Sequence, residues 1–173
     1  MGCTNHQYGE IDHLSNEKTY STLFVCTANQ CRSPMAEALF RMYITNAGYS
    51  SEEWIVESAG CWAYPGMPAT KKAVIAAEKL GAELYFHESK PVTESLLRDF
   101  RLILCMERNH VEFIKRHIPE AGERVFLFTE MVNENEEIND PIGQKQDDYN
   151  LTAENLLEQI GVGFNKIKKL SAL

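Results

Sequence analysis

Short apolar segments alternate along this chain with longer segments whose apolar residues recur at helical spacing. The short segments predict four buried strands, at residues 22–26, 54–58, 101–106 and 125–128. The longer segments predict four helices. The first starts at Ser33, and the other three span about residues 68–80, 108–117 and 152–170. Because strands that alternate with helices build βαβ units, we expect an α/β fold. It should be one three-layer αβα domain with a four-stranded parallel sheet.

The beginning of the chain lacks this pattern. Residues 1–20 are polar and show no period, so they offer no apolar face to bury against a core. We therefore expect residues 1–20 to form a flexible N-terminal extension and residues 21–173 to form the folded domain.

Composition excludes several classes of function. The 17 Lys and Arg against 25 Asp and Glu give a net charge of −8, which disfavours nucleic acid and anionic lipid as partners. The five cysteines are odd in number and follow no secretory signal, which favours free thiols in the cytoplasm. No apolar run approaches the roughly 20 residues of a membrane helix. Because no metal-type cysteine pairing occurs, we expect neither a metal nor a cofactor.

The end of the first predicted strand carries the candidate chemistry. Cys26 ends that strand and Arg32 follows six residues later, next to Ser33-Pro34, which suits a helix start with Ser33 as the N-cap. A loop between a strand and a helix can turn its backbone N–H groups inward and bind an anion. Arg32 would add a planar fork for two phosphate oxygens. The same positive field would favour the thiolate of Cys26, placed for in-line attack on phosphorus.

Cleavage of a phosphate ester also requires a proton for the leaving atom. Asp140 precedes Pro141 in a turn after the fourth predicted strand, at the carboxyl edge of the sheet where such folds bind ligands. It could act as general acid and then as base for the attacking water. From its own surroundings, Asp140 is better explained as a plain turn residue before proline, which is common.

Residues 24–40 closely resemble the low-molecular-weight protein tyrosine phosphatase family, whose loop reads V-C-x-G-N-x-C-R-S-P. Further segments of that family are matched in order by residues 56–60, His87 with the later Val-Thr pair, residues 100–107 and the Asp-Pro pair. The resemblance implies a phosphate-binding loop between the first strand and the first helix. It also implies a phosphatase that acts on a phosphorylated protein residue, above all phosphotyrosine, through a cysteinyl phosphate. Cys26, Arg32 and Asp140 would then be catalytic.

The resemblance also implies supporting roles around the loop. Asn29 is expected to take a left-handed backbone conformation, and its side chain to bond to Ser58 and His87. Ser33 is expected to donate to the nucleophile. The other loop residues are expected to surround the phosphate, namely Thr27, Ala28, Gln30 and Cys31. Cys31 could instead trap oxidised Cys26 as a disulfide, or could simply pack as a buried thiol.

The rim of the loop departs from the family and leaves the substrate open. Ala28 replaces the usual glycine, and Gln30 stands where members specific for phosphoarginine carry Thr. The Asp-Pro pair is followed by Ile142, which is closer to the D-P-F-G of bacterial members than to D-P-Y-Y. Tyr64, Trp62 and Ile142 are the candidates for a wall beside the substrate, where an aromatic ring could stack on an aryl phosphate.

Three other functions remain open. A protein-arginine phosphatase would share the fold and the nucleophile. An arsenate reductase would need two further redox cysteines on a mobile segment, where the chain offers only Cys105 in a predicted strand. A non-catalytic phosphate-binding module would need neither a thiolate nor an acid, so the presence of Cys26, Arg32 and Asp140 together argues against it. In the main interpretation the partner is a phosphorylated protein or peptide, with no nucleic acid and no membrane, and the protein is a monomer or weak dimer.

Overall fold

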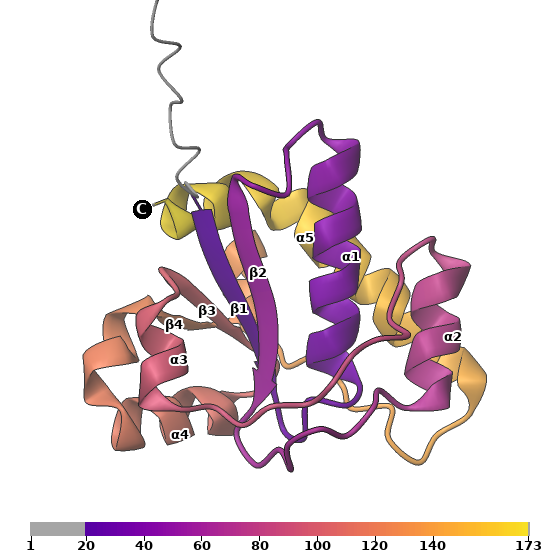
Figure 1. Cartoon of the computed structure of the whole chain (residues 1–173), viewed down its shortest axis with the longest axis horizontal. Helices are drawn as coiled ribbons and strands as arrows, with labels where there is room; N and C mark the ends of the chain where they lie inside the picture. Colours follow the sequence, from indigo (N-terminus) through magenta and orange to yellow (C-terminus); the bar gives the residue numbers. More distant parts are fainter. Residues whose placement is uncertain (1–19, 173) are drawn as a thin grey trace, which may run out of the picture.

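Parallel strands in the order β2-β1-β3-β4 form the sheet of this protein (Figure 1). The computed structural model describes residues 20–172. Its strands are β1 (Tyr20–Cys26), β2 (Trp54–Gly60), β3 (Leu102–Cys105) and β4 (Val125–Leu127). All residues of β3, and all of β1 after Tyr20, are buried, as expected for a parallel sheet covered on both faces. The predicted fold class is confirmed.

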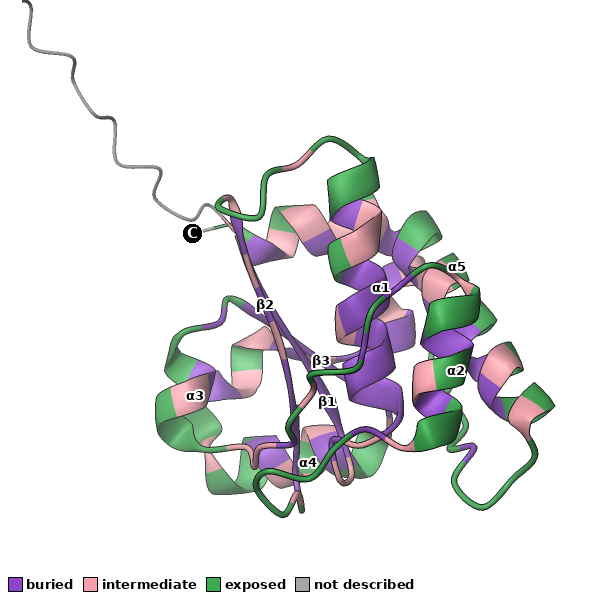
Figure 2. Cartoon of the chain, turned by 45° about the vertical axis from the view of Figure 1, so that its right-hand side comes forward, coloured by how far each residue is buried: buried purple, intermediate pink, exposed green. Residues whose placement is uncertain are grey.

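Helices cover both faces of the sheet. On one side lie α1 (Arg32–Asn46), α2 (Lys71–Lys79) and α5 (Gln146–Ser171), and on the other α3 (Glu94–Arg98) and α4 (Arg108–His117) (Figure 1). Two 3₁₀ turns flank β4, η1 (Pro119–Arg124) and η2 (Phe128–Val132). Figure 2 shows that the strands and the inner faces of the helices are buried, whereas the outer faces are exposed.

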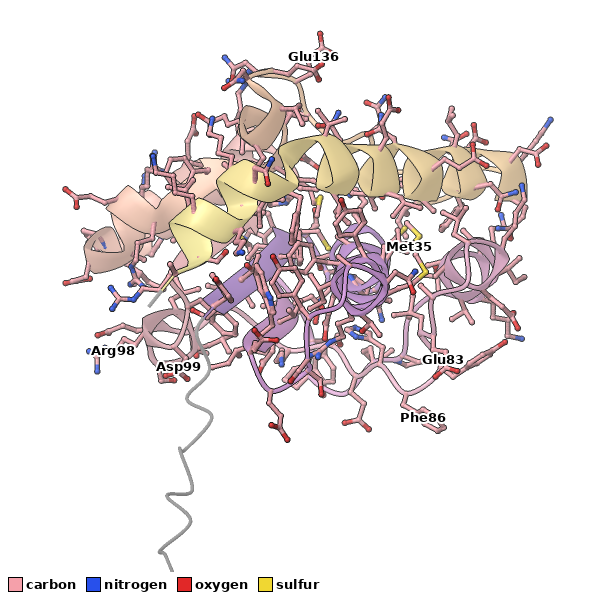
Figure 3. The ribbon with its side chains drawn as sticks, turned by 90° about the horizontal axis from the view of Figure 1, so that it is seen from above. Met35, Glu83, Phe86, Arg98, Asp99 and Glu136 are labelled. Carbon is pink, nitrogen blue, oxygen red and sulfur yellow. The ribbon has the colours of Figure 1, made fainter. Side chains whose placement is uncertain are left out.

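Two hydrophobic clusters fill the spaces between the layers. Neighbouring residues of β1 contribute to different clusters, because successive side chains of a strand point to opposite faces. Phe24 belongs to the cluster beneath α1 and α5, and Val25 to the cluster beneath α4. Figure 3 shows Met35 of α1 in the interior, whereas Phe86 and Glu136 lie at the periphery.

Several boundaries differ from those predicted. Of the predicted extension, residues 1–19 lie outside the described residues. Tyr20 already belongs to β1, and it forms an antiparallel bridge with Ala172, the last described residue. The last helix starts at Gln146, six residues earlier than predicted. Its first turn lacks apolar periodicity but carries acidic residues that favour a helix N-terminus, and Tyr149 anchors it in the core. The short helix α3 was not predicted.

The sheet topology determines where ligands can bind. The chain leaves β1 into α1 on one face and leaves β3 into α4 on the opposite face. The carboxyl ends of these neighbouring strands therefore form the switch point at which open α/β sheets bind ligands. Cys26 lies at the end of β1, and Glu107 follows the end of β3 by two residues. Among residues 20–172, no helix combines the length and apolar character required to cross a membrane.

Candidate active site

Asn29 holds the loop that joins β1 to α1. Its φ of 55° lies in the left-handed region, as predicted, and its side chain is buried. The amide nitrogen donates to Ser33 Oγ at 3.0 Å and to Ser58 Oγ at 2.8 Å, and the amide oxygen accepts the backbone N–H of Lys90 at 2.9 Å. One asparagine side chain thus ties the loop to α1, to β2 and to the segment that follows α2.

His87 contacts the loop in a different way from that predicted. Its Nε2 lies 2.6 Å from the backbone carbonyl oxygen of Asn29, and no bond joins it to the Asn29 side chain. The polar atoms of that side chain are already engaged by Ser33, Ser58 and Lys90. Since a carbonyl oxygen only accepts, His87 Nε2 is the donor. His87 therefore supports the backbone of the loop.

Gly60 permits close contact between the end of β2 and the loop. A Cβ at this position would lie 2.7 Å from the Thr27 carbonyl oxygen and 2.8 Å from the Asn29 nitrogen, which is shorter than real contacts allow. Any side chain there would displace the loop backbone. Ala28 causes no comparable strain, because it is absent from the non-glycine residues with positive φ among residues 20–172. The departure from the family glycine is thus tolerated.

The Cys26 thiol lies at the bottom of the loop with 3 % of the residue exposed. Its Sγ is 3.0 Å from Ser33 Oγ, and the same hydroxyl can donate to the Ala59 carbonyl oxygen at 3.2 Å. Ser33 is not the N-cap as predicted, because α1 starts at Arg32 and Cys31 holds the cap position. The Ser33 hydroxyl instead lies beside the sulfur, where it can stabilise a thiolate.

Arg32 is held by neighbours along one edge of its guanidinium. Nη1 donates to the carboxylate of Glu107 and to the Ile138 carbonyl oxygen at 2.9 Å. Nη2 donates to Thr27 Oγ1 at 3.2 Å and to Asp140 Oδ2 at 2.5 Å. Nε is buried and has no partner among residues 20–172. Buried donors are rarely left unpaired, so the Nε edge of a residue that is only 1 % exposed is a strong candidate for oxyanion binding.

Asp140 is a turn residue whose carboxylate also reaches the loop. Its Oδ1 accepts the N–H of Ile142 at 3.1 Å, which is the bond of a turn-forming aspartate. Its Oδ2 accepts from Arg32, so the turn brings the carboxylate to the loop that holds Cys26. The carboxyl side chain is 35 % exposed, and a substrate at the loop could therefore reach it.

Two further residues of the site were missed by the sequence analysis. Glu107, the N-cap of α4, forms an ion pair with Arg32. His110, in the first turn of α4, is completely buried and its Nε2 lies 3.0 Å from Thr27 Oγ1. The available signal was their position, because both follow the strand next to β1 on the carboxyl side of the sheet.

The predicted substrate wall consists of exposed side chains with different degrees of support. Trp62 is 53 % exposed, and its ring packs against Phe113 and His110 with centroids 5.3 Å and 5.9 Å apart. Tyr64 and Ile142 are 77 % and 52 % exposed. Of these three side chains, Trp62 is therefore the best anchored. Gln30 also lies at the rim, and its backbone carbonyl accepts the N–H of the residue that caps α2.

The four cysteines among the described residues are buried free thiols. Burial raises the pKa of the Cys31 thiol well above its usual range, and the nearby Asp140 and Cys26 add to the shift. Burial likewise raises the pKa of Cys61 to about 12. Because the thiolate is the reactive form, both are weak nucleophiles in the resting protein. Cys105 is completely buried in β3, which does not suit the mobile redox cysteine of an arsenate reductase.

Comparisons with known proteins agree with this geometry. The sequence profile of a family described as low molecular weight phosphotyrosine protein phosphatase matches residues 21–171. A protein-arginine-phosphatase of Bacillus subtilis is 36 % identical over 148 residues, which cover 85 % of this chain and 96 % of that protein.

Two solved structures extend the comparison. A low molecular weight protein tyrosine phosphatase from T. tengcongensis superposes with a TM-score of 0.80 at 34 % identity, covering 86 % of this chain and 99 % of that one. The YwlE arginine phosphatase, solved as a cysteine-to-serine mutant with a phosphorylated active-site serine, has a TM-score of 0.79 at 35 % identity and covers 86 % and 95 %.

Proposed function

This chain belongs to the low molecular weight phosphotyrosine protein phosphatase family, and from that membership we propose that it hydrolyses phosphotyrosine in proteins, with Cys26, Arg32 and Asp140 as its catalytic residues. The observation that carries the proposal is the buried guanidinium of Arg32, whose Nη2 donates to Thr27, the residue that follows Cys26. Its Nε has no partner among the described residues, while Nη1 is anchored by Glu107 and Ile138. Such an arrangement suits a bidentate bond to two phosphate oxygens.

In the first step the Cys26 thiolate attacks phosphorus and the bond to the tyrosine oxygen breaks. The phenolate that leaves takes a proton from the carboxyl group of Asp140, so the products are the dephosphorylated tyrosine residue of the substrate protein and a cysteinyl phosphate on Cys26. In the resting site Asp140 pairs with Arg32 Nη2. An incoming phosphate dianion replaces the carboxylate at that nitrogen. Asp140, released from its cationic partner, takes up a proton from solvent and can then donate it to the leaving oxygen.

In the second step water attacks the phosphorus of the cysteinyl phosphate. Asp140, now a carboxylate, accepts a proton from the water, and the sulfur–phosphorus bond breaks to give inorganic phosphate. The electron pair returns to Cys26 Sγ, where the Ser33 hydroxyl at 3.0 Å can stabilise the thiolate that leaves. The protein then returns to its starting state.

Replacing Asp140 with asparagine is expected to slow poor leaving groups far more than good ones. The amide keeps the turn bond but has no proton to give. We expect kcat/KM to fall about 10³-fold for phenyl phosphate and clearly less for p-nitrophenyl phosphate, whose anion is stable without a proton. A series of aryl phosphates measures this dependence. Asp147→Asn, an exposed carboxylate at the start of α5, is the matched control. Equal slowing along the series would remove Asp140 from the acid role.

The relative named protein-arginine-phosphatase makes phosphoarginine the second candidate substrate. The exposed rings of Trp62 and Tyr64 favour phosphotyrosine, because an aryl ring can stack against them. We expect kcat/KM for a phosphotyrosine peptide to exceed that for matched phosphoarginine and phosphoserine peptides at least about tenfold. Phosphate release from the three peptides, with wild-type enzyme, measures the order. A preference for phosphoarginine would replace the first candidate with the second.

The family implies phosphorylated proteins as partners. We further propose that this protein acts in the cytoplasm as a monomer or weak dimer. Its odd number of cysteines supports a reducing compartment, and its charge of −8 gives it little affinity for nucleic acid or anionic membranes.

A further inference from the structure

Four residues in and beside the loop form a closed ring of hydrogen bonds. The backbone N–H of Glu107 donates to His110 Nδ1 at 3.2 Å, and His110 Nε2 lies 3.0 Å from Thr27 Oγ1. Thr27 Oγ1 accepts from Arg32 Nη2 at 3.2 Å, and Arg32 Nη1 returns to the carboxylate of Glu107. The ring thus runs from the buried histidine to both Nη atoms of the guanidinium.

The ring determines the tautomer of His110. Since Nδ1 accepts a hydrogen bond, the proton of the neutral imidazole lies on Nε2, which must donate to Thr27. His110 is completely buried, and this burial lowers its pKa to about 4. The carboxylates of Glu107, Asp140 and Glu137 oppose that shift, while Arg32 adds to it. The imidazole is therefore neutral at the pH at which the thiolate reacts.

Thr27 links the histidine to the arginine. Its hydroxyl oxygen accepts from two donors, His110 Nε2 and Arg32 Nη2, so the position of that oxygen is constrained from both sides. A planar guanidinium binds an oxyanion with two parallel bonds only when its plane is held in the right orientation. Glu107 holds Nη1, and Thr27 is the neighbour through which His110 can hold Nη2.

We propose that His110 is a positioning residue for phosphate binding, which orients the Arg32 guanidinium through Thr27 and Glu107. This inference rests on the proposed function, because it assumes that Arg32 binds the phosphate. The alternative is a purely structural role, in which His110 Nδ1 only satisfies the N–H of Glu107 at the start of α4. The two roles use different nitrogens of the same ring and can be separated.

Two substitutions separate the functions of the two imidazole nitrogens of His110. The amide nitrogen of His110→Gln reaches about as far as Nε2 and can donate to Thr27, but the variant loses the acceptor at Nδ1. The amide oxygen of His110→Asn takes the place of Nδ1, but the variant loses the donor to Thr27. His117→Asn, on the exposed end of the same helix, is the matched control.

We expect His110→Asn to weaken inhibition by vanadate and to lower kcat/KM for p-nitrophenyl phosphate, each about tenfold, because the bond to Thr27 is lost. His110→Gln should stay within about threefold of wild type, since it keeps that bond. Thr27→Val should match His110→Asn, and the double variant should be no worse than either single one, because both changes break the same link.

The outcomes distinguish this inference from the proposed function. If wild type fails to turn over any aryl phosphate, the proposed function is wrong, and vanadate binding by calorimetry still ranks the variants. If His110→Gln loses as much vanadate affinity as His110→Asn, or His110→Asn loses none, the positioning role is wrong. Additive losses in the double variant would equally contradict it. Thermal unfolding of each variant checks that the variant is folded under the assay conditions, so that a loss of affinity is not due to unfolding.

Discussion

Replacing Cys26 with serine is expected to reduce the turnover of p-nitrophenyl phosphate by about 10⁴-fold or more. A serine hydroxyl is a weak nucleophile unless a base removes its proton. Cys26 Sγ forms its hydrogen bond with the Ser33 hydroxyl, which cannot act as a base. Steady-state assays at neutral pH measure the loss. Because the oxygen is smaller than the sulfur and the loop amides are unchanged, the variant should still bind vanadate or phosphate.

Cys105→Ser is the matched control for this experiment. Cys105 is also a buried free thiol, but it ends the neighbouring strand β3 and lies outside the loop. We expect this variant to keep most of its activity, with any loss explained by packing. If Cys26→Ser retained more than about a hundredth of wild-type turnover, or if both variants lost the same amount, Cys26 could not be the nucleophile.

Replacing Arg32 with lysine is expected to lower kcat/KM for p-nitrophenyl phosphate by about 10³-fold, although the positive charge is kept. A lysine ammonium is a single point of donation. It cannot bond to Glu107 and Ile138 while also offering two parallel N–H groups to a phosphate. Vanadate inhibition should weaken in parallel, because the lost bonds hold the oxyanion itself.

The variant Arg41→Lys, on an exposed turn of the same helix, is the control for a change from arginine to lysine. Thermal unfolding must be measured for both variants. Arg32 forms ion pairs with Glu107 and Asp140, so its loss also removes the counterion of two neighbouring carboxylates. If Arg32→Lys lowered the melting temperature but bound vanadate as tightly as wild type, Arg32 would have a structural role only.

The features that were predicted correctly depend on residues that are close together in the chain. The run from Cys26 to Arg32 spans seven residues, and its place between an apolar strand and a helical segment could be predicted from local periodicity. The left-handed conformation of Asn29 was expected from the resemblance to the family, and asparagine tolerates that conformation better than most residues. The detail of the helix start was wrong, since Ser33 turns toward the sulfur instead of capping the helix.

The residues that were missed depend on contacts between distant segments. No local pattern distinguishes Glu107 and His110 from other polar residues near the start of a helix. Gly60 belongs to a segment that resembles the family, but its need for a hydrogen side chain comes from the backbone of a loop more than thirty residues earlier. The bond of His87 to a backbone carbonyl depends on which side-chain atoms of Asn29 are already occupied.

By itself, the sequence determined the order of the strands, the order of the longer helices and the loop that contains Cys26 and Arg32, and its resemblance to the family singled out Asp140 as the candidate acid. These depend on hydrophobic periodicity and on residue types within a few positions of one another. Only the tertiary structure decided what surrounds the guanidinium, because Glu107 and Asp140 are 75 and 108 positions away from Arg32 in the chain. They reach it because β3 pairs beside β1 and the chain then turns to the opposite face, and the order of strand pairing is a property of the whole sheet.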